Sequence, residues 1–295
     1  MTSESLNQEA TLQPAPRAVG RPSTGFTGTL RAIYIIWYRD LLRFWRDRAR
    51  IVASLAQPLL FLLIFGTGLS AALAGSGQAT GPVDYIQFMF PGIIGMAVLF
   101  SAVFGAMSIV WDREFGFLKE VLVAPIDRSA VAIGKSLGGA TQAMLQGLIL
   151  LVLAPVVGVK LTIASVLLVV PFVFLLAFAL SAMGVALASR MRTMQGFQIV
   201  MNFLMMPMFF LSGALFPLSN LPAWLTVLTR LNPATYGIDP IRRIILGPTL
   251  PPGTSDQFGL TIAGQVVPMA LEALVLIGFG LAMLAVAVRN FRKRD

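Results

Sequence analysis

The chain has 295 residues, of which 57% are hydrophobic and only 12% are charged. Soluble domains average about 25% charged residues, so the composition excludes an ordinary soluble protein and indicates an integral membrane protein. The absence of cysteine excludes disulfides and thiol chemistry, and the absence of histidine removes the commonest general base and metal ligand. A net charge of +9 would suggest nucleic acid as the partner of a soluble chain. Here the basic residues are distributed as in membrane proteins, so we expect no nucleic-acid partner. We also expect no metal site.

The N-terminal region divides into a polar tail and a basic helix. Residues 1–25 are rich in Ser, Thr, Pro and Gly, which predicts a disordered cytoplasmic tail. No apolar core follows the initiator methionine, so this start does not resemble a signal peptide. Residues 27–48 interleave arginines with aromatic and aliphatic residues, which predicts an amphipathic interfacial helix in the inner headgroup layer. The same stretch can also be the flank of the first span, and the two interpretations are compatible.

Long apolar stretches follow, each near the ~20 residues that a helix needs to cross ~30 Å of hydrocarbon. They predict an all-α integral membrane protein with six transmembrane helices. The predicted spans are residues 52–74, 88–110, 136–159, 161–188, 197–216 and 265–288. A short cytoplasmic tail of residues 291–295 completes the chain.

The distribution of basic residues orients these spans. With the N-terminus in the cytoplasm, 18 of the 22 lysines and arginines lie on the inner side. The outer side holds four, namely Lys160, Arg230, Arg242 and Arg243. Because inner loops of membrane proteins carry the excess of lysine and arginine, this division places both termini in the cytoplasm.

The loop between the second and third predicted spans is amphipathic and charge-balanced. Residues 111–128 read WDREFGFLKEVLVAPIDR. Their apolar side chains recur along one stripe of a helix, at Trp111, Phe115, Leu118 and Leu122. Pro125 ends that helix. This pattern favours a docking surface for a soluble partner, and a solvated connector lying on the headgroups is an equally good reading of the pattern alone.

The segment before the last span is too apolar for an ordinary loop. Residues 213–247 are divided by prolines into short pieces, and we expect two short external helices there. Such backbone at membrane depth must be buried in protein or line a cavity. A cap that seals the bundle and a gate are equally consistent with it. Residues 248–263 are rich in Pro, Gly and Thr and predict an external loop.

Two features inside the spans are candidates for contact with a substrate. Glu272 is the only acid within a predicted span, about 10 Å from its outer end. We favour pairing with a neighbouring helix over contact with a substrate or ion. Met205 and Phe209 belong to a Met- and Phe-rich run in the fifth span. They fit a pliable apolar pathway, although packing against lipid or a second subunit is the preferred explanation for most of this run.

No nucleotide-binding motif is found in the sequence. Gly134-Lys135-Ser136 matches the end of a phosphate-binding loop, but Ser129 stands where that motif needs a glycine. If ATP is used, another chain must bind it. An integral membrane enzyme is disfavoured, since without histidine or cysteine no nucleophile–base pair can be drawn.

Taken together, the chain resembles the ABC type-2 permeases, the membrane subunits of exporters driven by a separate ATPase. The resemblance rests on REFGFLKEVLVAPIDRSAVAIGK at 113–135 and on the segment 212–247, and it assigns residues 26–290 to one transmembrane domain.

The resemblance implies that two permeases, identical or different, pair above two copies of a cytoplasmic ATPase that uses ATP and Mg²⁺, with no cofactor in this chain. It implies a multi-pass protein of a bacterial or archaeal plasma membrane. The substrate would pass along the permease–permease interface, lined mainly by the first, second and fifth spans. ATPase coupling is carried over to Arg113, Glu114, Phe115, Gly116, Leu118, Glu120 and Pro125.

The closest match within the family is the daunorubicin-resistance branch, which implies export of an amphiphilic drug or lipid-like substrate. Export of a polysaccharide or wall glycan is the alternative. A glycan path should show a row of aromatic side chains, whereas Tyr is scarce here. An ion-coupled secondary transporter is less favoured because buried charge is nearly absent from the predicted spans.

Overall fold

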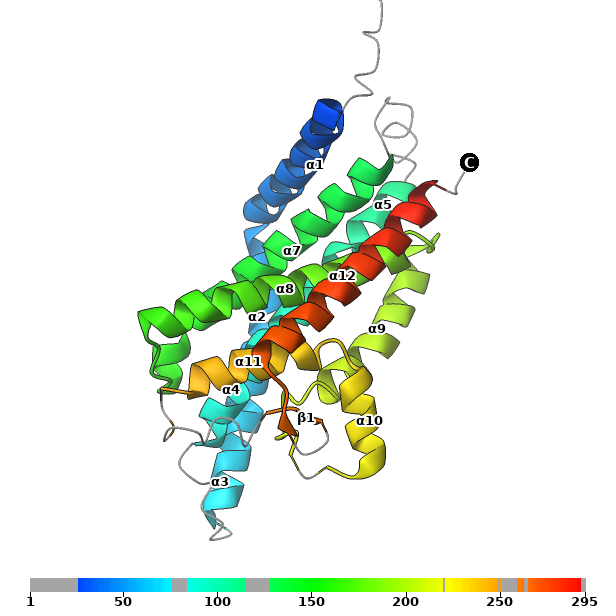
Figure 1. Ribbon diagram of the computed structural model, residues 1–295. Coiled ribbons are helices and arrows are strands. Elements are labelled where there is room, and N and C mark those ends of the chain that lie inside the picture. Colours follow the sequence, from blue (N-terminus) through cyan, green and yellow to red (C-terminus); the bar gives the residue numbers. More distant parts are fainter. Residues whose placement is uncertain are drawn as a thin grey trace, which may run out of the picture.

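The computed structural model describes residues 26–75, 84–114, 128–219, 221–248, 250, 259–262 and 265–292. Within these ranges the regular secondary structure is helical, apart from a hairpin of two short strands, β1 (Thr261–Ile262) and β2 (Gln265–Val266). The helices form an elongated bundle (Figure 1). The start of α1 (Phe26–Arg46) and the C-terminal end of α12 (Met269–Arg292) lie at the same end, here called the basic end. The end with α3 (Thr67–Gly75) is called the distal end.

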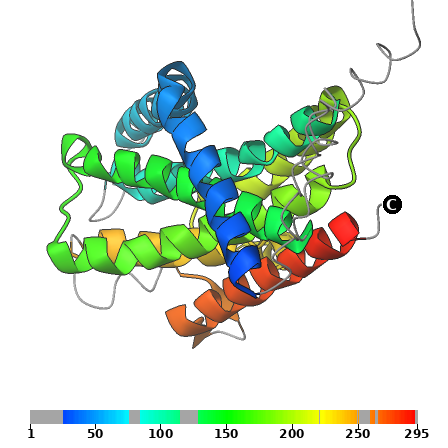
Figure 2. The same cartoon turned by 90° about the horizontal axis from the view of Figure 1, so that it is seen from above.

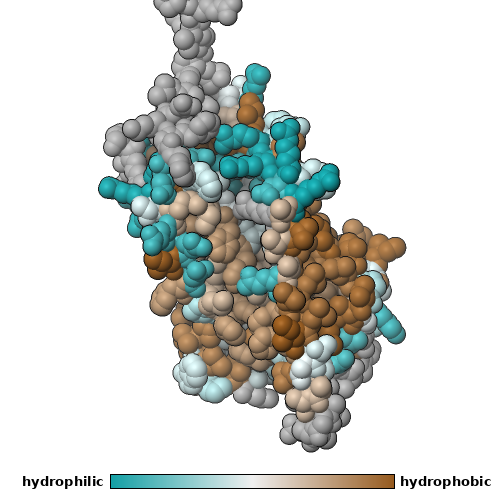
Figure 3. Space-filling model, turned by 180° about the vertical axis from the view of Figure 1, so that it is seen from behind, coloured by the Kyte–Doolittle hydropathy of each residue, from teal (hydrophilic) through white to brown (hydrophobic). Residues whose placement is uncertain are grey.

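The surface follows the pattern expected of a membrane protein. Hydrophilic side chains gather at the basic end, and hydrophobic side chains cover much of the middle of the molecule (Figure 3). By length and composition, four helices of the described chain could cross a membrane: Ile51–Ala72, Tyr85–Glu114, Ile163–Ala188 and Met269–Arg292. The described chain is therefore an all-helical membrane fold with several long apolar helices.

The first predicted span is built from consecutive helical pieces. After a break at Asp47, α1 leads into α2 (Arg48–Phe61), a π-helical turn (Leu62–Gly66) and α3. α1 packs on α7 (Arg128–Val152) and crosses the bundle when the molecule is viewed from above (Figure 2). This arrangement suits the predicted interfacial helix, because one side of α1 contacts the bundle while Tyr34, Tyr38 and Trp45 are exposed.

The centre of the bundle is α4 (Tyr85–Gly105), which is buried along most of its length and continues through Ala106 into α5 (Met107–Glu114). It packs against α7 and α8 (Ile163–Ala188). A short 3-10 helix (Ala154–Val157) and a turn join α7 to α8. α7 is 25 residues long, and among its apolar residues it carries three polar ones: Lys135, Gln142 and Gln146. All three of these polar side chains are buried.

The fifth and sixth predicted spans correspond to α9 (Met194–Phe210), a shorter apolar helix, and to α12. α12 begins four residues after the predicted start at 265, because β2 occupies that position. The carbonyl of Pro268 then accepts the first helical hydrogen bonds, from the backbone nitrogens of Leu271 and Glu272. The hairpin also places β-structure at the end of the stretch that the sequence predicted as a plain external loop.

Between α9 and α12 the chain forms α10 (Ala223–Leu231) and α11 (Thr235–Leu246). Two short helices were expected in this segment, and two are present. They differ in environment: α10 exposes Trp224 and Leu231, whereas α11 is buried along almost its whole length against α8, α4 and α12. α11 is thus part of the packed core, whereas α10 lies at its surface.

Gly92 of α4 lies close to the backbone of Ala214, in the turn after α9, and this contact allows a test of the packing. A Cβ atom added at Gly92 would overlap the backbone of Ala214, whereas one added at Gly278 on α12 would meet nothing within 4 Å. Gly92→Ala should therefore destabilise the protein by about 1–3 kcal/mol through overpacking. Gly278→Ala should be neutral or stabilising by up to about 1 kcal/mol, since Ala is the better helix former. Thermal unfolding of the purified variants checks this, and equal melting temperatures would contradict the packing.

Candidate functional site

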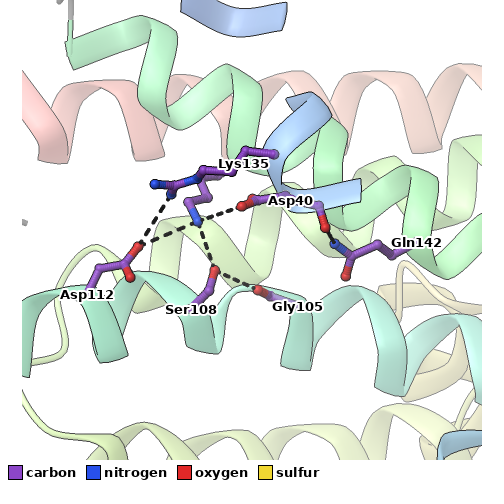
Figure 4. Close-up of polar contacts among 7 residues, drawn as sticks. Asp40, Gly105, Ser108, Asp112, Lys135 and Gln142 are labelled. Carbon is purple, nitrogen blue, oxygen red and sulfur yellow. Dashed lines mark hydrogen bonds and ion pairs between the residues drawn. The ribbon is translucent and has the colours of Figure 1, made fainter. Parts of the chain in front are cut away.

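A buried ionic cluster joins three helices at the basic end (Figure 4). The Lys135 Nζ of α7 lies 3.1 Å from the Asp40 Oδ1 of α1 and 3.6 Å from the Asp112 Oδ2 of α5. It also donates a hydrogen bond of 3.1 Å to the Ser108 Oγ of α5. A nitrogen of Arg39 lies 4.0 Å from the same Asp112 oxygen, at the exposed side. With two acids and two bases, the cluster is neutral.

The cluster forms where α1 approaches α7 closely. Gly138 leaves room for Asp40, since a Cβ there would lie 3.3 Å from the Asp40 Oδ2. The Gln142 Nε2 donates to the backbone carbonyl of Asp40 at 3.0 Å, and the indole of Trp37 donates to the Thr141 hydroxyl at 3.0 Å. Small residues permit such approach, and the polar contacts then hold it in place. α1 is therefore fixed to α7 by polar bonds as well as by packing.

A second polar contact lies at the end of α5, directly before the predicted coupling segment. Arg113 donates to the backbone carbonyls of Ser189, at 3.1 Å, and Met191, in the turn that ends α8. Glu114 accepts a hydrogen bond of 2.8 Å from the backbone nitrogen of Met194, the first residue of α9. A cation at the C-terminus of one helix and an anion at the N-terminus of the next both match the helix dipoles. We call this pair and its contacts the α5–α9 clamp.

The α5–α9 clamp is also tied to the last span. The Asn290 Nδ2 of α12 donates to the Ser189 Oγ at 2.9 Å and to the Ala186 carbonyl at 3.4 Å. The turn between α8 and α9 is therefore held from α5 on one side and from α12 on the other.

Of the residues carried over as ATPase-coupling residues, Arg113 and Glu114 are described, and both bind the chain's own turn. The others, Phe115, Gly116, Leu118, Glu120 and Pro125, lie outside the described residues. The sequence analysis did not identify Asp40 or the α8–α9 turn as part of this site. The only local signal was that Lys135 begins an otherwise apolar stretch, and a long-range partner for it is not visible in a sequence pattern.

A second buried ionic cluster lies toward the distal end, around Glu272. The Glu272 Oε2 lies 2.5 Å from the Arg243 Nη2 of α11, and the same nitrogen lies 3.0 Å from the Asp239 Oδ2. That oxygen also accepts from the backbone nitrogen of Leu260 at 3.1 Å. Buried charge was expected to be nearly absent from the predicted spans, and the structure buries further charge outside them. α11 brings three further charges, Asp239, Arg242 and Arg243, into the interior.

Arg242 is fully buried and connects α11 to its surroundings. It donates to the backbone carbonyls of Gly213 and Ala214, the latter at 3.1 Å. Its guanidinium carbon lies 4.2 Å from the centre of the Phe88 ring of α4, a cation–π contact. Gly213 has φ +74°, a left-handed conformation that favours glycine. The turn after α9 therefore presents its carbonyls to Arg242 and holds α11 against α4.

The two candidate pathway residues of the fifth span lie inside the protomer. Met205 and Phe209 are buried, and Phe209 meets Phe61 of α2 edge-on at 5.7 Å between ring centroids. The exposed face of α9 is formed by other residues: Ile199, Phe203, Met206 and Phe210. Any surface that α9 offers to a second subunit is therefore made of these residues and not of Met205 and Phe209.

Neither cluster resembles a cofactor site. Among the described residues, no group of three or more His, Cys, Asp or Glu side chains could hold a metal ion. Lys135, the lysine of the loop-like Gly134-Lys135-Ser136, lies within α7 and pairs with Asp40, not in a loop after a strand. This position agrees with the rejection of a phosphate-binding loop.

The distal cluster generates a thermodynamic prediction. Removing one partner of a buried ion pair leaves an uncompensated charge and costs about 3–5 kcal/mol. Arg243→Met should therefore lower stability strongly, because it leaves the carboxylates of Glu272 and Asp239 without their shared partner. Glu272→Leu should cost less, because Arg243 keeps Asp239. The double variant should recover part of the loss of Arg243→Met, because it removes one of the two unpaired carboxylates. Thermal unfolding of the three variants checks this, and additive losses in the double variant would show that Glu272 and Arg243 do not interact energetically.

Comparison with known proteins agrees with these features. The model of the family described as ABC-2 type transporter matches residues 31–246. The transport permease ycf38 of Cyanophora paradoxa is 28% identical over 72% of this chain and 73% of its own length. Nodulation protein J of Rhizobium meliloti (strain 1021) is 28% identical over 82% of this chain and 91% of its own. The inner membrane transport permease YadH of Escherichia coli (strain K12) is 27% identical over 73% and 83%.

The family match covers more than half of the chain, including both ionic clusters except Glu272. Permeases of this family are non-catalytic transport components and work with ATPase subunits. The chain belongs to the ABC-2 type transporter family and is the membrane permease subunit of an exporter of that type.

Proposed function

We propose that this permease moves an amphiphilic drug or lipid-like substrate out of the cell, driven by a separate cytoplasmic ATPase that binds ATP and Mg²⁺. The observation that carries the proposal is the α5–α9 clamp. Arg113 and Glu114 stand at the beginning of the predicted coupling segment and bind the turn from which α9 starts. Hydrogen bonds therefore join the coupling segment to the start of α9, so a displacement of the segment can reach the fifth predicted span.

The proposed mechanism begins when the ATPase closes on ATP and shifts the coupling segment that docks on it, residues 113–125. The shift reaches the α8–α9 turn through the α5–α9 clamp. Hydrogen bonds to charged groups are worth about 1.5–3 kcal/mol each, so this contact can transmit a displacement without being broken. α9 then moves relative to α2 and α4, the other helices expected to line the substrate path.

The proposed assembly contains two permeases, identical or different, and two copies of the ATPase. Apolar side chains that a lone protomer leaves exposed support the pairing. They lie on the first span, at Leu63, Ile64 and Phe65, and on α9, at Phe203, Met206 and Phe210. A route between two such faces would offer rings and flexible thioethers, which adapt to amphiphiles of different shapes.

The proposed orientation places the basic end in the cytoplasm of a bacterial or archaeal cell, with the permease in the plasma membrane. The excess of lysine and arginine at this end supports it. The same orientation puts Arg113 and Glu114 on the side where ATP is available. Nucleotide binding is assigned to the partner chain.

The α5–α9 clamp can be tested by removing one of its two charged side chains. Arg113→Ala should lower the amount of daunorubicin, a fluorescent amphiphile, that is moved per ATP hydrolysed by about tenfold or more, since at least 1.5 kcal/mol of contact is lost. Arg192→Ala is the matched control, because Arg192 is exposed in the same turn. Transport and ATP hydrolysis are measured together in proteoliposomes that contain the permease and its ATPase. Unchanged coupling in Arg113→Ala, with the control also unchanged, would overturn the role of the clamp.

Partner binding is tested by purification in gentle detergent through a tag after Asp295. An ATPase should co-elute, and its yield should fall in the double variant Glu114→Ala/Glu120→Ala while the amount of membrane-inserted permease stays the same. A solitary permease without ATPase activity would contradict the proposed assembly, and uptake driven by an ion gradient would then be measured.

A further inference from the structure

A cavity of about 610 Å³ lies at the basic end between α1, α2, α4, α5 and α7. Small-molecule sites in proteins typically measure about 300–1,000 Å³, so this cavity is large enough for a drug-sized molecule. α2 and α4 are also expected to line the route between two permeases, but α9, the third helix of that route, contributes none of the residues that line the cavity.

Part of the cavity lining is polar and uncharged. Ser54, Gln57, Ser101, Gln142 and Gln146 form this part. Two of these side chains are fixed by bonds within the protein: Gln142 donates to the Asp40 carbonyl at 3.0 Å, and Gln146 donates to the Ser54 hydroxyl. Both bonds use the amide nitrogens, so the amide oxygens remain as acceptors for a ligand. Gln142 and Gln146 are buried, and a buried polar group is costly unless something hydrogen-bonds to it.

The lining residues of α4 and the start of α5 are largely apolar and aromatic. They include Met96, Phe100, Phe104 and Met107, and the rings of Phe100 and Phe104 lie 6.3 Å apart. Apolar walls with a few convergent polar groups are the usual composition of a small-molecule site. The polar and apolar lining residues together suit a molecule that carries both polar and apolar groups.

The charges around the cavity balance one another, and this limits the kind of ligand head group that the cavity can bind. Asp40 lines the cavity but is paired with Lys135, and the exposed Arg43 and Asp47 at the rim have opposite signs. A strongly charged head group would find no net counter-charge there. The exposed lining residues Arg43, Asp47, Ala53 and Gln57 also locate the rim where α1 meets α2, at the level expected for the inner headgroups.

We propose that this cavity binds an amphiphile with an uncharged, hydroxyl- or amide-bearing head group and an apolar body on the inner side of the membrane. Two sources share this chemistry: the exported substrate before transport, and a resident membrane lipid. As a loading site for the substrate the proposal rests on the proposed export function, whereas binding itself does not.

The test uses the absence of cysteine from the chain. Ser101→Cys is a near-isosteric change in the cavity wall, and Lys160→Cys, in the exposed turn before α8, is the control. Each variant is purified with its ATPase, stripped of lipid in amphipol, and alkylated with N-ethylmaleimide, with or without dodecyl maltoside as the probe. At about nine times its Kd the probe leaves about a tenth of the sites empty, so the cavity cysteine should react about tenfold more slowly. The control should not change.

The source of the ligand is identified by repeating the reaction in nanodiscs of phosphatidylcholine that contain diacylglycerol, a membrane lipid with an uncharged hydroxyl head group. Protection without the probe that persists during ATP hydrolysis assigns the cavity to a resident lipid. Protection that needs the probe and is relieved by ATP hydrolysis assigns it to the exported substrate. A cavity cysteine that is equally reactive under all conditions, or unreactive even in lipid-free amphipol, overturns the inference. Protection requires no transport, so its failure is separate from a failure of coupling through Arg113.

Discussion

Every charge that this fold buries must find its partner inside the protein, because hydrocarbon offers neither water nor counter-ions. The described chain meets this constraint in two places, around Lys135 and around Arg243. Each place joins helices that are far apart in the sequence, and between them the helices contact one another mainly through apolar and small residues. The two ionic clusters therefore determine which helices are fixed together at each end of the bundle.

The pairing of charges in the distal cluster also bears on the source of energy. An ion-coupled carrier needs a group that gains and loses a proton or cation during transport. Glu272 is paired with Arg243 at 2.5 Å, and Asp239 binds the same guanidinium. A carboxylate held in this way suits a permanent structural contact better than a cycle of protonation. The buried charge in α11 therefore does not favour an ion-coupled secondary transporter. It is consistent with a permease whose energy comes from a separate ATPase.

The sequence predicted the helices, which depend on local pattern, and missed the contacts between residues that are far apart in the chain. Apolar runs and prolines located the long helices and the two short helices before the last span, because helix length and helix ends are local properties. The partner of Glu272 could not be found in this way, since Arg243 lies 29 residues earlier in a segment that looked external. Asp40 and Lys135 are 95 residues apart, and the prediction of an interfacial helix gave no indication that one of its acids would be buried.

A single short helix, α5, brings the functional features of the basic end together. Ser108 and Trp111 line the cavity, Asp112 pairs with Lys135, and the two residues after it form the α5–α9 clamp. These contacts lie within two turns of one helix, so α5 cannot tilt or rotate without affecting all of them. In the proposed mechanism a shift of the coupling segment would therefore move α9 and reshape the cavity in the same step. Release of a bound amphiphile and opening of the path would then be linked by geometry, without a separate signal between the two sites.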